Sequence, residues 1–388
     1  MTTTKNNEHK KLNVPNLRFP EFSGEWEEFG LSELLDFKNG LNPKPDKFGK
    51  GIKFISVMDI LNNAVITYDC IKASVDVTEK ELSDFSVEKG DMLFQRSSET
   101  LEDVGRANVY MDDKTAVFGG FVIRGKKKGE YDPQYFNYLL RSPFARKRII
   151  PMGAGAQHFN IGQEGLSKVK LHFANIEEQN KIGKMLSLLD ERISIQSKII
   201  DKLQSLIKGI RNDVFGKLRK NIGFNAVVGD VLDYEQPQSY IIEDTEYTNE
   251  GTPVLTANKA FVLGYTLETD GIYDKGDCII FDDFTLDCKY VDFPFKVKSS
   301  AIKILTAKNK ELLHYTFEFL KYLDLSTEEH KRHYIAQTQN QEFILPTEQM
   351  VKTIAHIFSI LSLRMETAVK QRDEFEKQKQ YLLRQMFI

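Results

Sequence analysis

Residues 177–190 read EEQNKIGKMLSLLD, and residues 348–361 read EQMVKTIAHIFSIL. Both stretches begin with acidic and amide side chains and then repeat apolar residues at the spacing of an amphipathic helix. When the two are aligned, a row of apolar residues recurs at a constant offset of 172 positions and continues past both stretches, from the pair Ile182 and Ile354 to the pair Ile210 and Leu382. A constant offset over this length indicates an internal duplication.

The first stretch continues as a heptad pattern that Gln196 alone interrupts, which predicts a coiled-coil helix over residues 176–215. Asn175 is placed to cap this helix, and Glu178 stands three residues later, where a capping-box side chain would reach back. The second stretch predicts a helix over 346–388, introduced by Pro346. Its apolar row is weaker, because Arg372 and Lys379 fall within it and their stems would have to extend out of any contact.

The two predicted helices match in length and have few other apolar partners nearby in sequence, so we expect them to pack against each other. The alternative is two separate surface helices. The residues predicted to form the helix–helix contact are Ile182, Leu186, Leu189, Ile193, Ile200, Leu203, Ile207, Ile210, Ile354, Phe358, Leu361, Met365, Phe375 and Leu382.

Each helix is preceded by short apolar runs separated by Gly, Pro, Asn and Asp, which read as strands of a mixed α/β globule. A second pair of similar segments, EKGDMLF at 88–94 and DKGDCIIF at 274–281, extends the duplication into these globules. We therefore predict a tail at 1–13, a first domain at 14–175, a central helix at 176–215, a second domain at 216–345 and a C-terminal helix at 346–388. Helices of constant length between diverging globules suggest two different recognition surfaces at a fixed separation, for which a nucleic acid is the obvious ligand.

Bulk composition agrees with two domains, because 388 residues exceed one ordinary core. The sequence has no long uncharged apolar stretch, so we expect a cytoplasmic protein without a membrane span. A net charge of −3 lacks the basic field of a free-standing DNA-binding domain, although lysines at 126–128 and the basic run at 141–148 form local patches. The three cysteines include no CxxC pair, which argues against disulfides and thiolate zinc sites.

Catalytic motifs are missing from the sequence. It holds neither the [DNS]PP[YFW] loop of amino-methyltransferases, which DFPF at 292–295 only approximates, nor a GxxxxGK[ST] phosphate loop. The pair Asp287 and Lys289 has no preceding acid in a recognisable strand, which disfavours a nuclease site. His330 and His333 have no evident third ligand, so we predict no metal site. We expect no catalysis by this chain.

Together, the opening VPNLRFPEFSGEWEEFGLSELLDF, the paired KGD segments, the stretch FDDFTLDCKYVDFPFKVKSSAIKIL and the two EQ-containing helix starts resemble the specificity (HsdS) subunit of a type I restriction-modification system. The proline that commonly precedes the helix in this family is kept as Pro346 but is absent from HFANIEEQ. The resemblance covers residue 14 to the C-terminus.

The resemblance implies an α/β fold with two similar target recognition domains, each reading one half of a split double-stranded DNA site. Two long antiparallel helices would hold the domains apart in a pseudo-twofold arrangement. It also implies that methyltransferase subunits, two in number, dock on the chain and supply S-adenosylmethionine chemistry at adenine. Two motor-endonuclease subunits would add ATP- and Mg-dependent cleavage, so this chain would bind no cofactor itself.

We choose candidate DNA-binding residues by chemistry and position, since Arg and Gln suit base edges and glycine-rich loops allow close approach to phosphate. In the first domain they are Gln95, Arg96, Ser97, Ser98, Arg106, Lys126, Lys127, Gln157 and His158. In the second domain they are Asn258, Lys259, Asp283, Thr285, Lys289, Ser299, Ser300, Arg332 and His333. Two other functions remain open: a structural adaptor whose globules bind protein, and a stand-alone nuclease.

Overall fold

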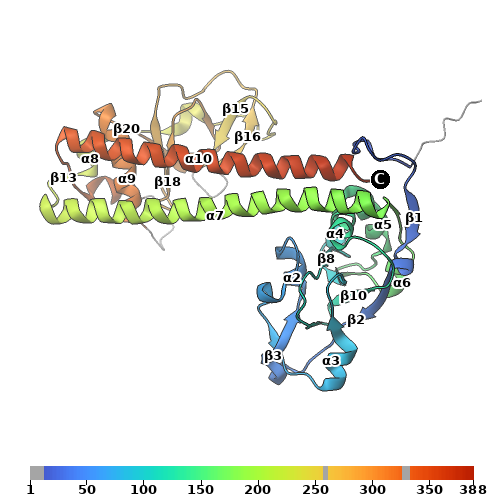
Figure 1. Cartoon of the computed structure of the whole chain (residues 1–388). Coiled ribbons are helices and arrows are strands. Elements are labelled where there is room, and N and C mark those ends of the chain that lie inside the picture. Colours follow the sequence, from blue (N-terminus) through green and yellow to red (C-terminus); the bar gives the residue numbers. More distant parts are fainter. Residues whose placement is uncertain (1–12, 257–260, 326–332) are drawn as a thin grey trace, which may run out of the picture. The chain divides into compact units, whose positions relative to one another are not determined.

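The computed structural model describes residues 13–256, 261–325 and 333–388, and the chain divides into two compact units. Unit 1 comprises the described residues up to Gln196 together with Gln371–Ile388, and unit 2 comprises the described residues of Ser197–Lys370. Figure 1 labels the two long helices, α7 (Ile176–Asn221) and α10 (Glu348–Gln385). Each of them contributes one part to each unit.

Unit 1 is a mixed α/β globule built on two four-stranded sheets, ordered β2-β10-β6-β8 and β4-β3-β9-β5, with the two-stranded pairs β1-β12 and β7-β11. Its strands are β1 (Glu27–Gly30), β2 (Leu35–Asn39), β3 (Phe48–Ile55), β4 (Ser74–Val75), β5 (Ser86–Val87), β6 (Met92–Gln95), β7 (Ser97–Ser98), β8 (Ala107–Val109), β9 (Ala116–Phe118), β10 (Val122–Lys127), β11 (Phe159–Asn160) and β12 (Lys170–Phe173). Its shorter helices are α1 (Leu31–Leu34), α2 (Val57–Asn62), α3 (Glu79–Phe85), α4 (Pro133–Arg141), α5 (Pro143–Ile149) and α6 (Gln163–Ser167).

Unit 2 is also mixed α/β, with a four-stranded sheet ordered β14-β20-β17-β18, a three-stranded sheet ordered β16-β15-β19 and the pair β13-β21. Its strands are β13 (Ala226–Val227), β14 (Leu232–Glu235), β15 (Thr252–Leu255), β16 (Val262–Thr266), β17 (Cys278–Asp282), β18 (Cys288–Val291), β19 (Lys296–Val297), β20 (Ile302–Ala307) and β21 (Glu342–Phe343). Its shorter helices are α8 (Val228–Val231) and α9 (Leu313–Leu323).

The central sheets of the two units share one frame. In each, four strands pair antiparallel in the same order, and a four-residue helix, α1 or α8, leads into the first strand. The turn after the third strand repeats as well: Gly105 N donates to Gln95 O at 2.9 Å, and Leu286 N donates to Asp282 O at 3.0 Å. Gly105 has φ +66° and Leu286 has φ +62°, so even a backbone conformation that disfavours leucine is kept. The duplication predicted from the sequence therefore extends through the globules.

The long helices pair within each unit, and their direction follows from the contacts. In unit 1, Lys379 Nζ lies 2.5 Å from Asp190 Oδ1, and Arg192 lies over the Phe375 ring at 5.9 Å. In unit 2, Arg211 lies over the Phe358 ring at 5.8 Å. Residue numbers on α10 fall as those on α7 rise, so the pairing is antiparallel. All fourteen residues predicted for the helix–helix contact are buried or half-buried. That each of them touches the opposite helix stays a prediction.

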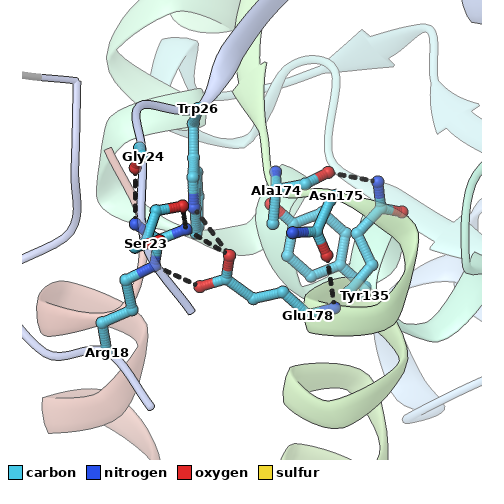
Figure 2. Close-up of polar contacts among 9 residues, drawn as sticks. Arg18, Ser23, Gly24, Trp26, Tyr135, Ala174, Asn175 and Glu178 are labelled. Carbon is cyan, nitrogen blue, oxygen red and sulfur yellow. Dashed lines mark hydrogen bonds and ion pairs between the residues drawn. The ribbon is translucent and has the colours of Figure 1, made fainter. Parts of the chain in front are cut away.

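The start of α7 is anchored by a buried carboxylate. As expected, the Asn175 side chain caps the helix, with its Oδ1 accepting from Glu178 N at 2.9 Å. The prediction that the Glu178 side chain reaches back to the cap is wrong. Figure 2 shows this fully buried carboxylate turned the other way, accepting from Arg18 Nε at 2.8 Å, Arg18 Nη2 at 2.7 Å and Trp26 Nε1 at 3.3 Å. A charged partner 160 residues away holds Glu178 more strongly than the neighbouring backbone amide could.

The same helix runs six residues beyond the predicted boundary at 215. Phe215 leaves the heptad row and packs within unit 2 against Tyr315, Phe319 and Phe358, with ring centroids 5.4, 5.4 and 6.5 Å away. The helix stops at Asn221, and Gly223 follows with φ +74°, the left-handed conformation that ends many helices.

Candidate nucleic-acid interface

The candidate sites lie at the ends of β6 in unit 1 and β17 in unit 2, the strands that stand third in the order of the two four-stranded sheets. In unit 1, Arg96 follows β6, and its backbone N donates to Phe121 O at 2.9 Å. In unit 2, Asp283 follows β17, and its backbone N donates to Ala301 O at 2.9 Å. Arg96 and Asp283 therefore occupy the same position, as do Phe121 and Ala301. The two copies carry side chains of different chemistry on one backbone frame.

In unit 1, two loops meet beside Arg96. Strand β7, which holds Ser97 and Ser98, pairs with β11, and the Ser97 hydroxyl is hydrogen-bonded to Asn160 Oδ1. Gln157 and His158 lie exposed in the loop just before β11. The structure therefore brings these five predicted DNA-binding residues, from Arg96 to His158, onto neighbouring loops.

Two other predicted residues border this surface. Arg106 is exposed and forms a 2.6 Å ion pair with Asp103. The Gln95 side chain is buried, and its Nε2 donates to Ser97 O at 2.9 Å. Gln95 therefore supports the loop, and its burial argues against direct contact with a base.

Beside Arg106 lies a basic groove of about 430 Å³, whose lining includes Arg141 and Arg146. Arg146 Nη2 donates to Glu102 O at 2.8 Å and to Val104 O at 2.6 Å. Burial, with a smaller contribution from the charge of Arg106, lowers the pKa of Arg146 to about 10. The basic run at 141–148 thus supplies arginines next to the candidate surface, and these arginines are not among the predicted DNA-binding residues.

Lys126 and Lys127 are not brought to this surface. They close β10, whose first residue, Val122, lies opposite Gln95, so five residues of extended strand, about 17 Å, separate Lys127 from that end. Lys126 lies 3.5 Å from Glu88, and Lys127 Nζ donates to Tyr131 O at 3.0 Å.

An apolar cleft next to Arg96 was missed by sequence reasoning. This cleft of about 420 Å³ is bordered by Ser97 and by three exposed apolar side chains, Phe48, Met58 and Phe121, which are 42%, 61% and 68% exposed. The segment AVFGGFVIRG reads as one apolar strand, but its paired glycines at 119–120 form a turn that leaves Phe121 at the surface. A Gly-Gly dipeptide is a turn signal, and it could have revealed this residue.

In unit 2 the predicted residues are divided. Thr285 and Ser299 are exposed, Lys289 and Ser300 are half-buried, and Asn258, Lys259 and Arg332 lie outside the described residues. Asp283 and His333 are buried, which argues against direct contact with DNA by either side chain.

Asp283 instead organises the polypeptide that packs against the strand end. Its Oδ1 accepts from His333 N at 3.0 Å and from Tyr334 N at 2.8 Å, and its Oδ2 lies 3.5 Å from the buried Lys303 Nζ. The same strand position therefore bears the half-exposed Arg96 in unit 1 and a buried loop-holding carboxylate in unit 2.

Within the described ranges, no three His, Cys, Asp or Glu side chains are grouped so as to hold a metal ion. In the same ranges, no helix has the length and apolar character needed to cross a bilayer.

Comparison with known proteins gives matches to type I restriction-modification specificity proteins. The family model of the type I restriction modification DNA specificity domain matches residues 23–205. The type I restriction enzyme EcoR124I/EcoR124II specificity subunit of Escherichia coli is 44% identical over 126 residues, which are 31% of this chain and 31% of that protein. The putative type I restriction enzyme MjaX specificity subunit of Methanocaldococcus jannaschii is 26% identical over 214 residues, or 54% of this chain and 50% of the relative. The chain therefore spans about a third to a half of the length of these relatives.

A solved structure supports the fold along nearly the whole chain. The crystal structure of the type I restriction-modification S subunit from M. genitalium superposes with a TM-score of 0.67 and 16% sequence identity, covering 97% of this chain and 99% of that one. Residues 23–205 of this chain therefore match the type I restriction modification DNA specificity domain, and nearly the whole chain shares the fold of that S subunit.

Proposed function

We propose that this chain is the DNA-recognition subunit of a type I restriction-modification complex. Each unit would read one half of a bipartite double-stranded site. The observation that carries the proposal is the shared frame, on which Arg96 and Asp283 occupy one strand position and the surrounding loops differ. A duplicated frame with divergent loops suits two half-sites of different sequence, because base readout depends on side chains and phosphate contacts set only the position.

We further propose that this chain performs no catalysis and that partner subunits complete the complex. Two methyltransferase subunits would bring S-adenosylmethionine and modify adenine, and two motor-endonuclease subunits would bring ATP- and Mg-dependent cleavage. The complex would act in the cytoplasm, in defence against foreign DNA. In unit 1, the candidate base contacts are Arg96, Ser97, Ser98, Gln157 and His158, with Arg106 positioned for phosphate. In unit 2, the exposed candidates are Thr285 and Ser299, beside the half-buried Lys289 and Ser300.

The test is to sequence methylated adenines in cells that carry the methyltransferase partner with and without this chain. We expect a bipartite methylated motif only when the chain is present. Exchanging residues 222–345 for those of a relative should change one half of the motif and leave the other unchanged. The exchange starts after Asn221 because α7 continues to that residue.

Three outcomes would contradict the proposal. A motif that does not depend on this chain would exclude a recognition role. A chain that assembles with partner proteins while neither it nor the assembled complex binds DNA would favour an adaptor. Metal-dependent cleavage of DNA by the purified chain alone would favour a nuclease.

A further inference from the structure

The apolar cleft of unit 1 exposes side chains that a protein normally covers. Phe121 is 68% exposed, and Met58, which lies in α2, is 61% exposed. Val122 N donates to Gly119 O at 2.8 Å across the turn that carries Phe121, and Gly119 N donates to Ile55 O at 3.0 Å. The Phe121 ring is therefore presented to the surface from a backbone that is already fixed, which lowers the entropic cost of binding.

Arg96 connects the cleft with the polar loops described above. Its backbone N donates to Phe121 O, and its side-chain Nη1 donates to Gly120 O at 3.3 Å. The strand pairing ends at Gln95 and Val122, and the bond from Arg96 N to Phe121 O continues it by one position, so the Arg96 and Phe121 side chains leave the backbone from neighbouring points. Neighbouring base pairs of DNA are stacked about 3.4 Å apart. The two side chains can therefore address adjacent base pairs.

The chemistry of the Arg96 and Phe121 side chains determines which groups of a base pair each can contact. An arginine guanidinium suits the O6 and N7 acceptors of guanine, whereas phenylalanine can contact the methyl group of thymine in the major groove. The shared frame provides an internal comparison, because unit 2 has Asp283 and Ala301 at the two equivalent positions. At these two positions, an arginine beside an aromatic ring is therefore a feature of unit 1. This difference is expected of residues that determine which sequence one half-site must have.

We propose that Phe121 contacts the 5-methyl group of a thymine in the half-site read by unit 1, next to the base that Arg96 contacts. This inference rests on the proposed function, since it assigns a specificity-determining residue to the same DNA surface. The Phe121 ring packs on the methyl group at the rim of the cleft, and Ser97 at the same rim faces the polar edge of the base pair.

The experiment uses the complex of this chain with its methyltransferase subunits. The motif is first read from genomic DNA, and the half-site of unit 1 is the half that survives exchange of residues 222–345. Each thymine in that half-site is then replaced by deoxyuridine, which removes only the methyl group, and the Kd of each duplex is measured by fluorescence anisotropy. Burial of one methyl-sized group changes a binding constant about fourfold. We therefore expect one replacement to raise the Kd roughly three- to sixfold.

The variant Phe121→Ala should bind the unmodified duplex more weakly and should lose its sensitivity to that replacement. Because Phe121 is mostly exposed, folding should not be affected. Leu267→Ala is the matched control, since Leu267 is 67% exposed and belongs to unit 2. This control should keep the full sensitivity to deoxyuridine in the first half-site.

Four results would overturn the inference. A half-site without thymine on either strand would exclude it, as would equal sensitivity to deoxyuridine in the wild type and in Phe121→Ala. A third is insensitivity of the wild type to every replacement. The fourth is a combination of two results: the Phe121→Ala variant fails to assemble with the methyltransferase, and the wild-type complex shows no effect of deoxyuridine. The cleft would then be a site at which the methyltransferase docks. A methylated motif that is the same with and without this chain would instead refute the proposed function, and the inference about Phe121 would be refuted with it.

Discussion

Two glycines on α7 allow the packing of the long helix to be tested with one kind of substitution. Gly183 lies against the first turn of α4, where an added Cβ would come within 2.5 Å of Asp132 Oδ1 and 2.9 Å of Tyr135 N. Asp132 caps α4 by accepting from Tyr135 N at 2.6 Å. We therefore expect Gly183→Ala to disrupt this cap, even though alanine favours a helix.

The magnitude follows from three contributions. Overpacking costs about 1–3 kcal/mol, loss of the cap costs about 1 kcal/mol, and the higher helix propensity of alanine returns roughly 0.5–1 kcal/mol. The free energy of unfolding should therefore fall by about 1–3 kcal/mol. Trp26, the single tryptophan of the chain, is buried in unit 1 and reports on this region by its fluorescence during urea unfolding.

Gly209 provides the control on the same helix, because apart from the local backbone of α7 itself no described atom lies within 4 Å of the Cβ that would be added there. Gly209→Ala should raise the stability by about 0.5–1 kcal/mol, as expected from helix propensity alone. If Gly183→Ala were as stable as the wild type, the close approach of α7 to the cap of α4 would not exist in solution.

Three further predictions concern the ion pairs and the paired helices. Arg211 Nη2 lies 2.7 Å from Glu318 Oε2, and burial raises the pKa of Glu318 despite the opposing effect of Arg211. Arg211→Met should destabilise unit 2 by about 3–5 kcal/mol at pH 8 and by less at pH 5, because the unpaired carboxyl is protonated as pH falls; equal thermal shifts at both pH values would refute this. Asp283→Ala should release two backbone amides and impair recognition of one half-site only, so a methylated motif altered in both halves would count against it. Heptad insertions after both Leu203 and Met365, which lie on opposed stretches of the antiparallel pair, should lengthen the unspecified spacer by about three base pairs, and an unchanged spacer in an active variant would show that the helices do not set it.

The sequence was most informative where the structure is periodic. The heptad row identifies fourteen covered residues of the long helices and leaves Leu188 and Ile195, which are about half exposed, off the contact. Asn175 was recognisable as a cap because capping is a local interaction. The partner of Glu178 was not recognisable, because Arg18 is brought to it only by the fold.

Matching the candidate site residues of the two units requires the exact strand register. The sequence repeat gives this register only to within one residue. The segments KGDMLFQ and KGDCIIFD place Arg96 opposite Asp282 when they are aligned from their shared glycine and aspartate. Backbone hydrogen bonds instead match Arg96 with Asp283, because the second strand holds one additional residue. A shift of one residue turns a side chain to the other face of a strand, so the alignment alone could not identify the pair.

Under the proposed function, the two roles of this one strand position set different rules for changing what each unit recognises. At Arg96 the side chain is half exposed and a substitution alters mainly the surface that it forms, so new specificities can arise there one residue at a time. At Asp283 the carboxylate holds a neighbouring segment in place, and a substitution removes that support before it can create a new contact. Point mutation is therefore a productive route to altered recognition in the first unit, whereas the second unit is better altered by recombination that moves its whole globule at once.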